Sequence, residues 1–237
     1  MNKRQKDKRI KIGSTAKQRR KNRELCKKYP FLIPRNVWTD KITWDYRDVK
    51  KYGHTLADNF PTGWWKAFGA MICEELRDEL ILQNYLDKFR VFDIKEKYGG
   101  LRFYYGSAPF DVDNIENIID RYSHLSENIC IKCGKPDVPM IDTGWYSPYC
   151  YDCFRNMRKY MEHYYIKHVD NYVVETEDEI KDKYNKCICS KDHRMADTYT
   201  VRHFSQSGNW DKIIDVSDTA NKIRSHWKER NKNGSVR

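Results

Sequence analysis

Four of the chain's eight cysteines form two pairs with the spacing of a metal-binding site. Cys130 and Cys133 make one C-x-x-C pair, Cys150 and Cys153 make another, and sixteen residues separate the two pairs. Each C-x-x-C turn brings two thiolates to one ion, and two turns supply the four sulfur ligands that zinc binds tetrahedrally. Because four protein ligands fill the coordination shell, we predict a structural zinc site. Two disulfides, or four unrelated buried cysteines, are the alternatives.

The residues around these pairs indicate how they are held. Gly134 follows the first pair and lets the backbone fold back as a zinc knuckle, and residues 135–149 are long enough for a short hairpin. The second pair stands at the start of a predicted helix reaching about His168, where the helix dipole favours thiolate. Knuckle, hairpin and helix are the order of a treble clef. We therefore predict a treble-clef-like zinc finger with its following helix over residues 129–168.

A second metal site is an open alternative further along the chain. Cys187 and Cys189 in "KCICSKDH" could act with His193 or His203. The C-x-C spacing is a poorer geometry for one ion, and no partner pair matches it. Reduced cysteines on a strand or loop are therefore the favoured interpretation.

Catalytic motifs are scarce. The chain has no P-loop, no G-x-G-x-x-G, no nucleophile elbow and no H-E-x-x-H. The best enzyme candidate is Asp93 with Lys95 on a predicted strand, where a carboxylate could hold Mg²⁺ and the lysine could orient water. Glu74, Glu75 or Asp78 could add a carboxylate, but no acid is evident on a neighbouring strand. We predict a protein that is not an enzyme, with a metal-dependent nuclease as the weaker alternative.

The chain's basic excess gathers at the N-terminus. Residues 1–28 hold 13 Lys and Arg against two acidic residues, so they carry the whole net charge of +11. With few apolar side chains this segment cannot offset the entropy of ordering, and we predict a disordered basic arm. Such an arm would neutralise nucleic-acid phosphates. The predicted nucleic-acid-binding residues are Lys3, Arg4, Lys6, Lys8, Arg9, Lys11, Lys17, Arg19, Arg20, Lys21 and Arg23.

The remaining chain predicts an α+β fold, a small β-hairpin or sheet packed on amphipathic helices. Residues 29–128 form the body: a helix from Thr62, a hairpin over 89–106 and a helix over about 114–127. Their predicted buried stripes are Trp65, Phe68, Ile72, Leu76 and Leu80 in the first helix, and Ile115, Ile118, Ile119, Tyr122 and Leu125 in the second. The zinc finger's helix is expected to bury Phe154, Met157, Met161, Tyr164 and Tyr165 along one side.

Residues 169–237 form a C-terminal extension of helices and a strand. Thr176 and Glu179 have capping-box spacing, "TYTVRHF" at residues 198–204 is a predicted strand, and a terminal helix should point Ile223 and Trp227 inward. The longest clean apolar run, "AFGAMIC", is far short of a membrane span, and no apolar segment follows the basic N-terminus as in a secretory signal. We expect a soluble cytoplasmic protein without a membrane partner, its cysteines reduced or metal-bound.

Three stretches, "AFGAMICEELRDEL", "IKEKYGGLRFYY" and the C-x-x-C-G that follows, resemble a group of uncharacterised phage and prophage proteins. That group shares a K-E-K-[FY]-G-x-L-R-[FW]-Y segment followed by a helix and a C-x-x-C zinc motif, and the resemblance covers roughly residues 29–155. It implies a genetic context, a bacterial virus or prophage. The protein would then act in the host cytoplasm or in the virion.

Two function classes follow. The favoured one is a non-enzymatic, zinc-stabilised protein that binds nucleic acid, of unknown type, through its basic arm, with exposed Tyr or Trp able to stack on unpaired bases. It could act on host or defence nucleoprotein machinery. The alternative is a protein-binding inhibitor or adaptor directed at a host or anti-phage defence complex, since Trp and Tyr anchor protein interfaces. A virion component is a further alternative.

Overall fold

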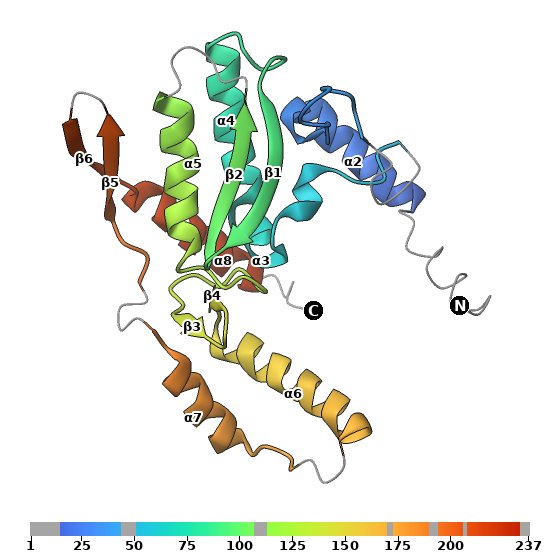
Figure 1. Ribbon diagram of the computed structural model, residues 1–237, viewed down its shortest axis with the longest axis vertical. Coiled ribbons are helices and arrows are strands. Elements are labelled where there is room, and N and C mark those ends of the chain that lie inside the picture. Colours follow the sequence, from blue (N-terminus) through green and yellow to red (C-terminus); the bar gives the residue numbers. More distant parts are fainter. Residues whose placement is uncertain are drawn as a thin grey trace. The chain divides into compact units, whose positions relative to one another are not determined.

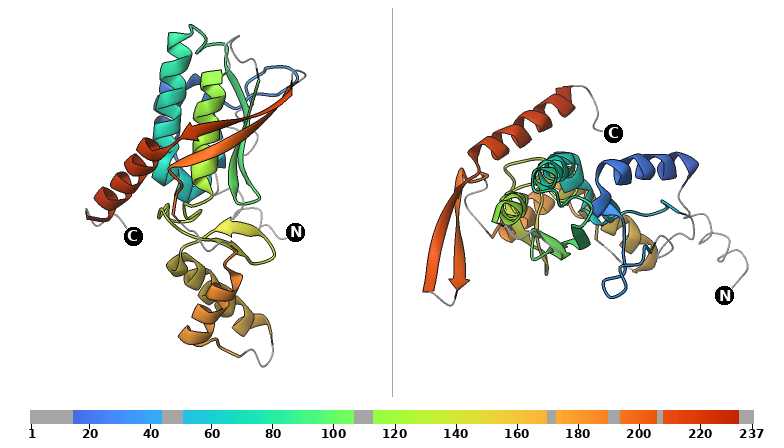
Figure 2. Two further views of the ribbon diagram at one scale, coloured as in Figure 1. Left: turned by 90° about the vertical axis from the view of Figure 1, so that its left-hand side faces the viewer. Right: turned by 90° about the horizontal axis from the view of Figure 1, so that it is seen from above.

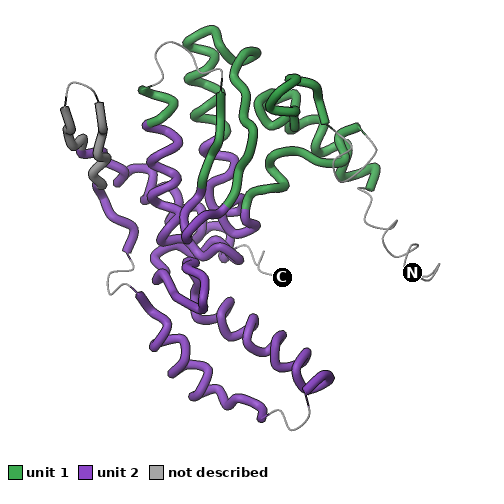
Figure 3. Tube along the Cα trace, in the orientation of Figure 1, with its two compact units in different colours: residues 1–60, 73–95, 102–116 green, residues 61–72, 96–101, 117–237 purple. Residues whose placement is uncertain are grey.

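The structure is a computed structural model that describes residues 15–43, 51–106, 113–169, 173–189, 194–205 and 208–232, with side chains left out for 199–212 (Figure 1, Figure 2). The chain divides into two compact units (Figure 3). Unit 1 comprises Met1–Phe60, Cys73–Lys95 and Arg102–Glu116, and unit 2 comprises Pro61–Ile72, Glu96–Leu101 and Asn117–Arg237. Helices and small two-stranded antiparallel sheets build both units, as the sequence predicted.

Unit 1 begins with helix α2 (Ala16–Lys28), capped by Thr15, whose hydroxyl accepts the Gln18 N–H at 3.1 Å. Asn22 and Cys26 are buried on one face of this helix. The prediction of a disordered arm is therefore wrong for residues 16–28, because these two small side chains anchor an otherwise polar helix. Residues 1–14 lie outside the described residues.

The core of unit 1 contains packed aromatic rings. Two short 3₁₀ helices, η1 (Pro30–Leu32) and η2 (Leu56–Asn59), contribute to unit 1. Phe31 packs edge-on against Phe89, with ring centroids 6.0 Å apart, and Phe89 packs against Tyr105 at 5.3 Å. Such pairs stabilise a core beyond their buried area.

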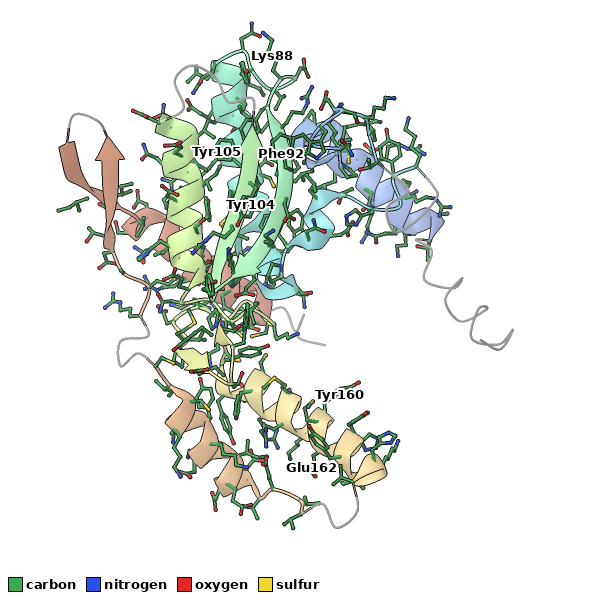
Figure 4. The ribbon with its side chains drawn as sticks, in the orientation of Figure 1. Lys88, Phe92, Tyr104, Tyr105, Tyr160 and Glu162 are labelled. Carbon is green, nitrogen blue, oxygen red and sulfur yellow. The ribbon has the colours of Figure 1, made fainter. Side chains whose placement is uncertain are left out.

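Strands β1 (Arg90–Lys97) and β2 (Gly100–Gly106) form the predicted hairpin, on which Figure 4 labels Phe92, Tyr104 and Tyr105. Tyr98 and Gly99 make its turn with φ of 54° and 81°. Positive φ at both positions is the signature of a type I′ hairpin turn. Along β1 burial does not follow the period of two of a regular strand, because Val91 and Ile94, three positions apart, are both buried.

The first long helix is interrupted. Helix α3 (Thr62–Trp64) passes through a π-helical segment η3 (Trp65–Gly69) into α4 (Ala70–Leu82). A π-turn inserts one residue into the helical register. Consequently Trp64 is fully buried in place of the predicted Trp65. The remaining predicted stripe is buried as expected: Phe68, Ile72, Leu76 and Leu80.

Helix α5 (Asp113–Ser126) buries its whole predicted stripe of Ile115, Ile118, Ile119, Tyr122 and Leu125. At its end the buried Ser126 hydroxyl accepts the Leu101 N–H at 2.8 Å. The hydrogen bond ties the last turn of the helix to strand β2.

The cysteine region follows α5. Strands β3 (Met140–Asp142) and β4 (Tyr146–Pro148) pair antiparallel and lead into helix α6 (Tyr151–His168). Helix α7 (Glu177–Cys187) starts at the predicted capping box of Thr176 and Glu179. One apolar cluster joins these elements: Ile141, Phe154, Ile180 and Tyr184.

The outer part of α6 differs from expectation. Phe154 is buried, but Met161 and Tyr164 are 38% and 54% exposed, so the predicted apolar stripe is buried only near its first turn.

Beyond α7, strands β5 (Thr198–Ser205) and β6 (Gly208–Asp215) pair antiparallel and precede α8 (Ser217–Lys232). Helix α8 buries Ile223, as predicted, whereas Trp227 is half-buried.

Candidate metal centre

The first cysteine pair lies on a tight backbone turn directly after α5. The Gly134 N–H donates to the Cys130 carbonyl at 2.9 Å, and the Cys130 N–H donates to the Lys135 carbonyl at 2.8 Å. Gly134 has φ of 85°, a conformation that glycine adopts without steric cost. The turn therefore folds back on itself and directs Cys130 and Cys133 to one point.

The second pair lies at the start of α6. Cys150 is the N-cap residue, its carbonyl accepts the Phe154 N–H at 3.0 Å, and Cys153 falls in the first turn. The N-terminal end of a helix carries partial positive charge, which favours thiolate. Burial of Phe154 in the apolar cluster fixes this end of the helix.

The four predicted cysteines come together. The sulfur atoms of Cys130, Cys133, Cys150 and Cys153 all lie within 4.8 Å of one another, an arrangement that can hold a metal ion. The Cys133 and Cys150 sulfurs are 3.7 Å apart, far longer than the roughly 2.05 Å of a disulfide. All four are free thiols, so the alternative of two disulfides is excluded in this structure, and their convergence is not that of four unrelated cysteines.

The thiols also influence one another's ionisation. Hydrogen bonding, led by Cys133, lowers the pKa of Cys130, whereas hydrogen bonding led by Cys130 raises the pKa of Cys153. One thiolate forms readily because its neighbours donate to it, and further charges in the same small volume repel. A bound cation would offset that repulsion and allow all four sulfurs to ionise.

Two residues some seventy positions earlier support the turn, and sequence reasoning missed them. The Trp64 indole N–H donates to the Ile129 carbonyl at 2.8 Å, and the Gly63 N–H donates to the Ile131 carbonyl at 2.9 Å. These bonds satisfy carbonyls on both sides of Cys130. The only signal in the sequence was a glycine followed by a tryptophan at the start of a helix, which carries no indication of its partner.

A carboxylate that follows the turn in the sequence joins this region to α8. Asp137, with φ of 55°, accepts the Met195 N–H at 2.9 Å and two guanidinium bonds from Arg224, each at 3.0 Å. Partial burial acts to raise the pKa of Asp137, but the bonds from Arg224 and Met195 outweigh it and lower that pKa. This charge-assisted pair ties α8 to the cysteine region.

The alternative second metal site gains no support from the described residues. Cys187 is half-buried and Cys189 exposed, whereas His193 and the side chain of His203 lie outside the description. Within the described ranges, the only group of three or more metal-binding side chains that converges is the set of four cysteines.

The nuclease candidates line a polar cavity of about 470 Å³ in unit 1. There the Lys95 ammonium lies 2.6 Å from an Asp93 carboxylate oxygen, and Asn59 donates to the other oxygen at 3.5 Å. The cavity adds His54 and Asp58 to this pair. It does not include the helix carboxylates that the sequence offered as further ligands, Glu74, Glu75 and Asp78.

The predicted nucleic-acid-binding residues fall into two groups. Lys3, Arg4, Lys6, Lys8, Arg9 and Lys11 lie outside the described residues. On α2 the side chains of Lys17, Arg20, Lys21 and Arg23 are exposed and Arg19 is half-buried. The Arg23 guanidinium lies 5.6 Å from the ring centroid of Tyr52.

No protein-family model, curated protein or solved structure matches this chain. The resemblance to phage and prophage proteins therefore stays a prediction from the quoted motifs. Within the described ranges, no helix combines the length and apolar character that crossing a bilayer requires.

Proposed function

We propose that the four cysteines bind zinc in a structural, treble-clef-like finger. The distance of 3.7 Å between the Cys133 and Cys150 sulfurs supports this, because a tetrahedral ion with bonds near 2.3 Å separates its ligands by about 3.8 Å. The order of turn, short hairpin and helix also supports it. Elemental analysis of the purified protein should find one zinc per chain, and none after Cys133→Ser.

We propose that the protein is a non-enzymatic nucleic-acid-binding protein acting through its basic N-terminal segment, residues 1–28. The observation that carries the proposal is the layout of α2, which has seven Lys and Arg and one acidic residue. Asn22 donates to the Tyr52 carbonyl at 2.8 Å, and burial raises the pKa of the Cys26 thiol to about 12, so it packs as a neutral group. These two residues hold the helix while its charged residues other than the half-buried Arg19 are exposed to solvent.

This arrangement suits sequence-tolerant binding. Lysine and arginine side chains that neutralise phosphates release condensed counterions, so affinity falls steeply as salt rises. A folded helix presents its charges in a fixed pattern and loses less entropy on binding than a disordered arm would. With the resemblance as its support, the proposed setting is the cytoplasm of a bacterial host, or a virion.

The test compares two full-length variants that lose the same charge. The α2 variant carries three changes on that helix, Lys17→Gln, Arg20→Gln and Lys21→Gln. The control variant changes three exposed lysines on α6, α7 and α8 and carries Lys167→Gln, Lys181→Gln and Lys222→Gln. On duplex DNA the α2 variant should reduce the slope of log affinity against log salt by about 2 to 3, whereas the control should change it little. Equal slopes for both variants would contradict the proposal.

A second candidate function, a protein-binding adaptor or inhibitor of a host or defence complex, is favoured by one observation. A cavity of about 430 Å³ is lined by residues of α6 and α7. Its lining includes the apolar side chains of Phe154, Met157, Met161 and Cys187 and the basic side chains of Arg158, Lys183 and Lys186. Tyr160 and Tyr164 are also exposed on α6, and Figure 4 labels Tyr160 there. The test is a pull-down from nuclease-treated lysate. A protein partner that is captured by the natural protein and by Lys222→Gln, but not by Met161→Lys, would support this function.

The nuclease alternative has its own test. A catalytic role for Asp93 predicts that Asp93→Asn abolishes Mg²⁺-dependent cleavage of a labelled oligonucleotide while the variant stays folded. Our proposal predicts that neither the natural protein nor the variant cleaves it.

A further inference from the structure

Two aromatic side chains from different hairpins stack on each other at the surface of unit 2. The rings of Tyr98, in the β1–β2 turn, and Trp145, in the β3–β4 turn, have centroids 6.1 Å apart and planes 18° from parallel. Tyr98 is 65% exposed and Trp145 is 55% exposed. Tyr98 stacks on one face of the indole, and more than half of the Trp145 surface is still exposed to solvent.

One carboxylate holds both turns in place. Glu96 accepts the Gly99 N–H at 2.7 Å and the Trp145 indole N–H at 3.1 and 3.2 Å to its two oxygens. The first bond closes the turn that carries Tyr98, and the second fixes the in-plane orientation of the indole. The pair is therefore ordered before any ligand arrives, which lowers the entropy lost on binding.

The stacked pair of Tyr98 and Trp145 carries a conformational strain energy at Tyr98. Tyr98 has φ of 54°, a left-handed conformation that non-glycine residues other than Asn and Asp seldom adopt. A type I′ turn favours Asn or Asp at this position. Tyrosine here accepts backbone strain and leaves a large ring mostly in water, an arrangement that packing alone does not explain.

The charge beside the pair indicates what it binds. The Lys97 ammonium lies 5.4 Å from the ring centroid of Tyr98, and its side chain is exposed. The carboxylate of Glu96 is engaged by its two donors. An exposed aromatic surface with an adjacent cation matches a nucleotide, whose base stacks and whose phosphate pairs with the ammonium.

We propose that Tyr98 and Trp145 form a stacking platform for an unpaired base of single-stranded nucleic acid. This inference rests on the proposed nucleic-acid-binding function and deepens it. The basic segment supplies affinity for any phosphate chain, and the platform selects strands whose bases are free to stack. A duplex keeps its bases inside and gains nothing from the platform.

The test measures binding of full-length protein to a labelled twenty-nucleotide oligo(dT) and to its duplex with oligo(dA), over a range of salt. Trp145→Ala should weaken oligo(dT) binding about 5- to 150-fold at every salt concentration, with the salt slope unchanged and duplex binding unaffected. Trp145→Phe keeps a ring and should restore much of the affinity. Trp38→Ala is the matched control, because Trp38 is 91% exposed in unit 1.

The outcomes separate the platform from the function on which it rests. If the natural protein binds neither oligonucleotide, both proposals fail. If it binds with a salt slope that depends on α2, but Trp145→Ala behaves like Trp38→Ala, only the platform is overturned. Zinc content and the unfolding midpoint of Trp145→Ala must equal those of the natural protein, so that lost binding is not lost folding.

Discussion

Gly63 and Gly134 meet backbone to backbone: a Cβ atom on Gly134 would lie 2.6 Å from the Gly63 carbonyl oxygen. A Cβ on Gly63 would lie 2.2 Å from the Cys130 carbonyl oxygen. Real Cβ atoms do not approach backbone this closely, so the start of α3 reaches the cysteine turn only because both residues lack a side chain.

Alanine at either position should therefore destabilise the protein. Gly63→Ala introduces the steric clash and should lower the free energy of unfolding by about 3 kcal/mol, because a Cβ there would lie within 2.7 Å of three backbone atoms. Gly134→Ala adds strain at φ of 85° and should cost about 2 to 4 kcal/mol, measured by urea unfolding.

Gly144 provides the control. It has φ of 88°, but a Cβ there would meet nothing within 4 Å. Gly144→Ala should therefore show the strain alone, about 1 kcal/mol. If Gly63→Ala proved as mild as Gly144→Ala, the close approach of α3 to the turn would be refuted.

Removal of one sulfur ligand should unfold the middle of the chain. Because structural zinc binding is coupled to folding, Cys133→Ser should lose the metal and at least about 3 kcal/mol of stability, as should chelation of the natural protein. Circular dichroism during a thermal scan, with metal analysis, checks this. Cys189→Ser removes an exposed thiol and should keep both metal and stability. Loss of metal in that variant would instead revive the second site.

The Asp137–Arg224 pair should make stability depend on pH. The pKa of Asp137 is lowered in the folded state, so its contribution is complete above the ordinary carboxyl pKa and disappears as the pH falls through the lowered value. Asn also tolerates positive φ, so Asp137→Asn changes the charge with little backbone effect. Near pH 7 the free energy of unfolding of Asp137→Asn should be about 1 kcal/mol below that of the natural protein, after allowing for solvent screening. Below about pH 4 this difference between the two proteins should become smaller.

A double-mutant cycle locates the effect. Arg224→Gln should cost a similar amount, and Asp137→Asn/Arg224→Gln should cost little more than either single change. Fully additive losses would mean that the two residues act separately.

Tyr98 should trade backbone strain against stacking. Tyr98→Asn removes the backbone strain of the left-handed conformation, which stabilises the protein by about 1 kcal/mol. It also removes the contact with Trp145, which destabilises the protein by about 1 kcal/mol, so the free energy of unfolding should change little. In a Trp145→Ala background the stacking is already absent, and the same substitution should stabilise by about 0.5 to 1 kcal/mol. Chemical unfolding of the four proteins of this cycle checks the prediction. A loss of stability in that background would contradict the strain argument.

Local patterns in the sequence predicted the features that depend on near neighbours. The spacing of the cysteine pairs identified the cluster, because each C-x-x-C turn is a local structure. The period of Ile115, Ile119 and Tyr122 identified the buried side of α5, because α5 is a regular helix. Both features need only the residues within one or two turns.

Features that depend on distant or irregular structure were missed. Trp64 replaced Trp65 in the core because a π-turn adds a residue that a regular helical period does not contain. Helix α2 has a polar sequence, and only Asn22 and Cys26 indicate that one side is anchored. On α6, Met161 and Tyr164 have helical spacing yet lie exposed, because spacing shows that residues share a side and not that a neighbour covers it.

The two bonds from Gly63 and Trp64 also bear on the order in which the protein can fold during synthesis. Their acceptors, the carbonyls of Ile131 and Ile129, leave the ribosome more than sixty residues later. A nascent chain that ends before Ile129 therefore has a buried tryptophan position with no acceptor for its indole. Long-range contacts of this kind slow folding and expose apolar surface in the meantime. The start of α3 can therefore reach its final packing only after the chain has been made as far as the cysteine turn.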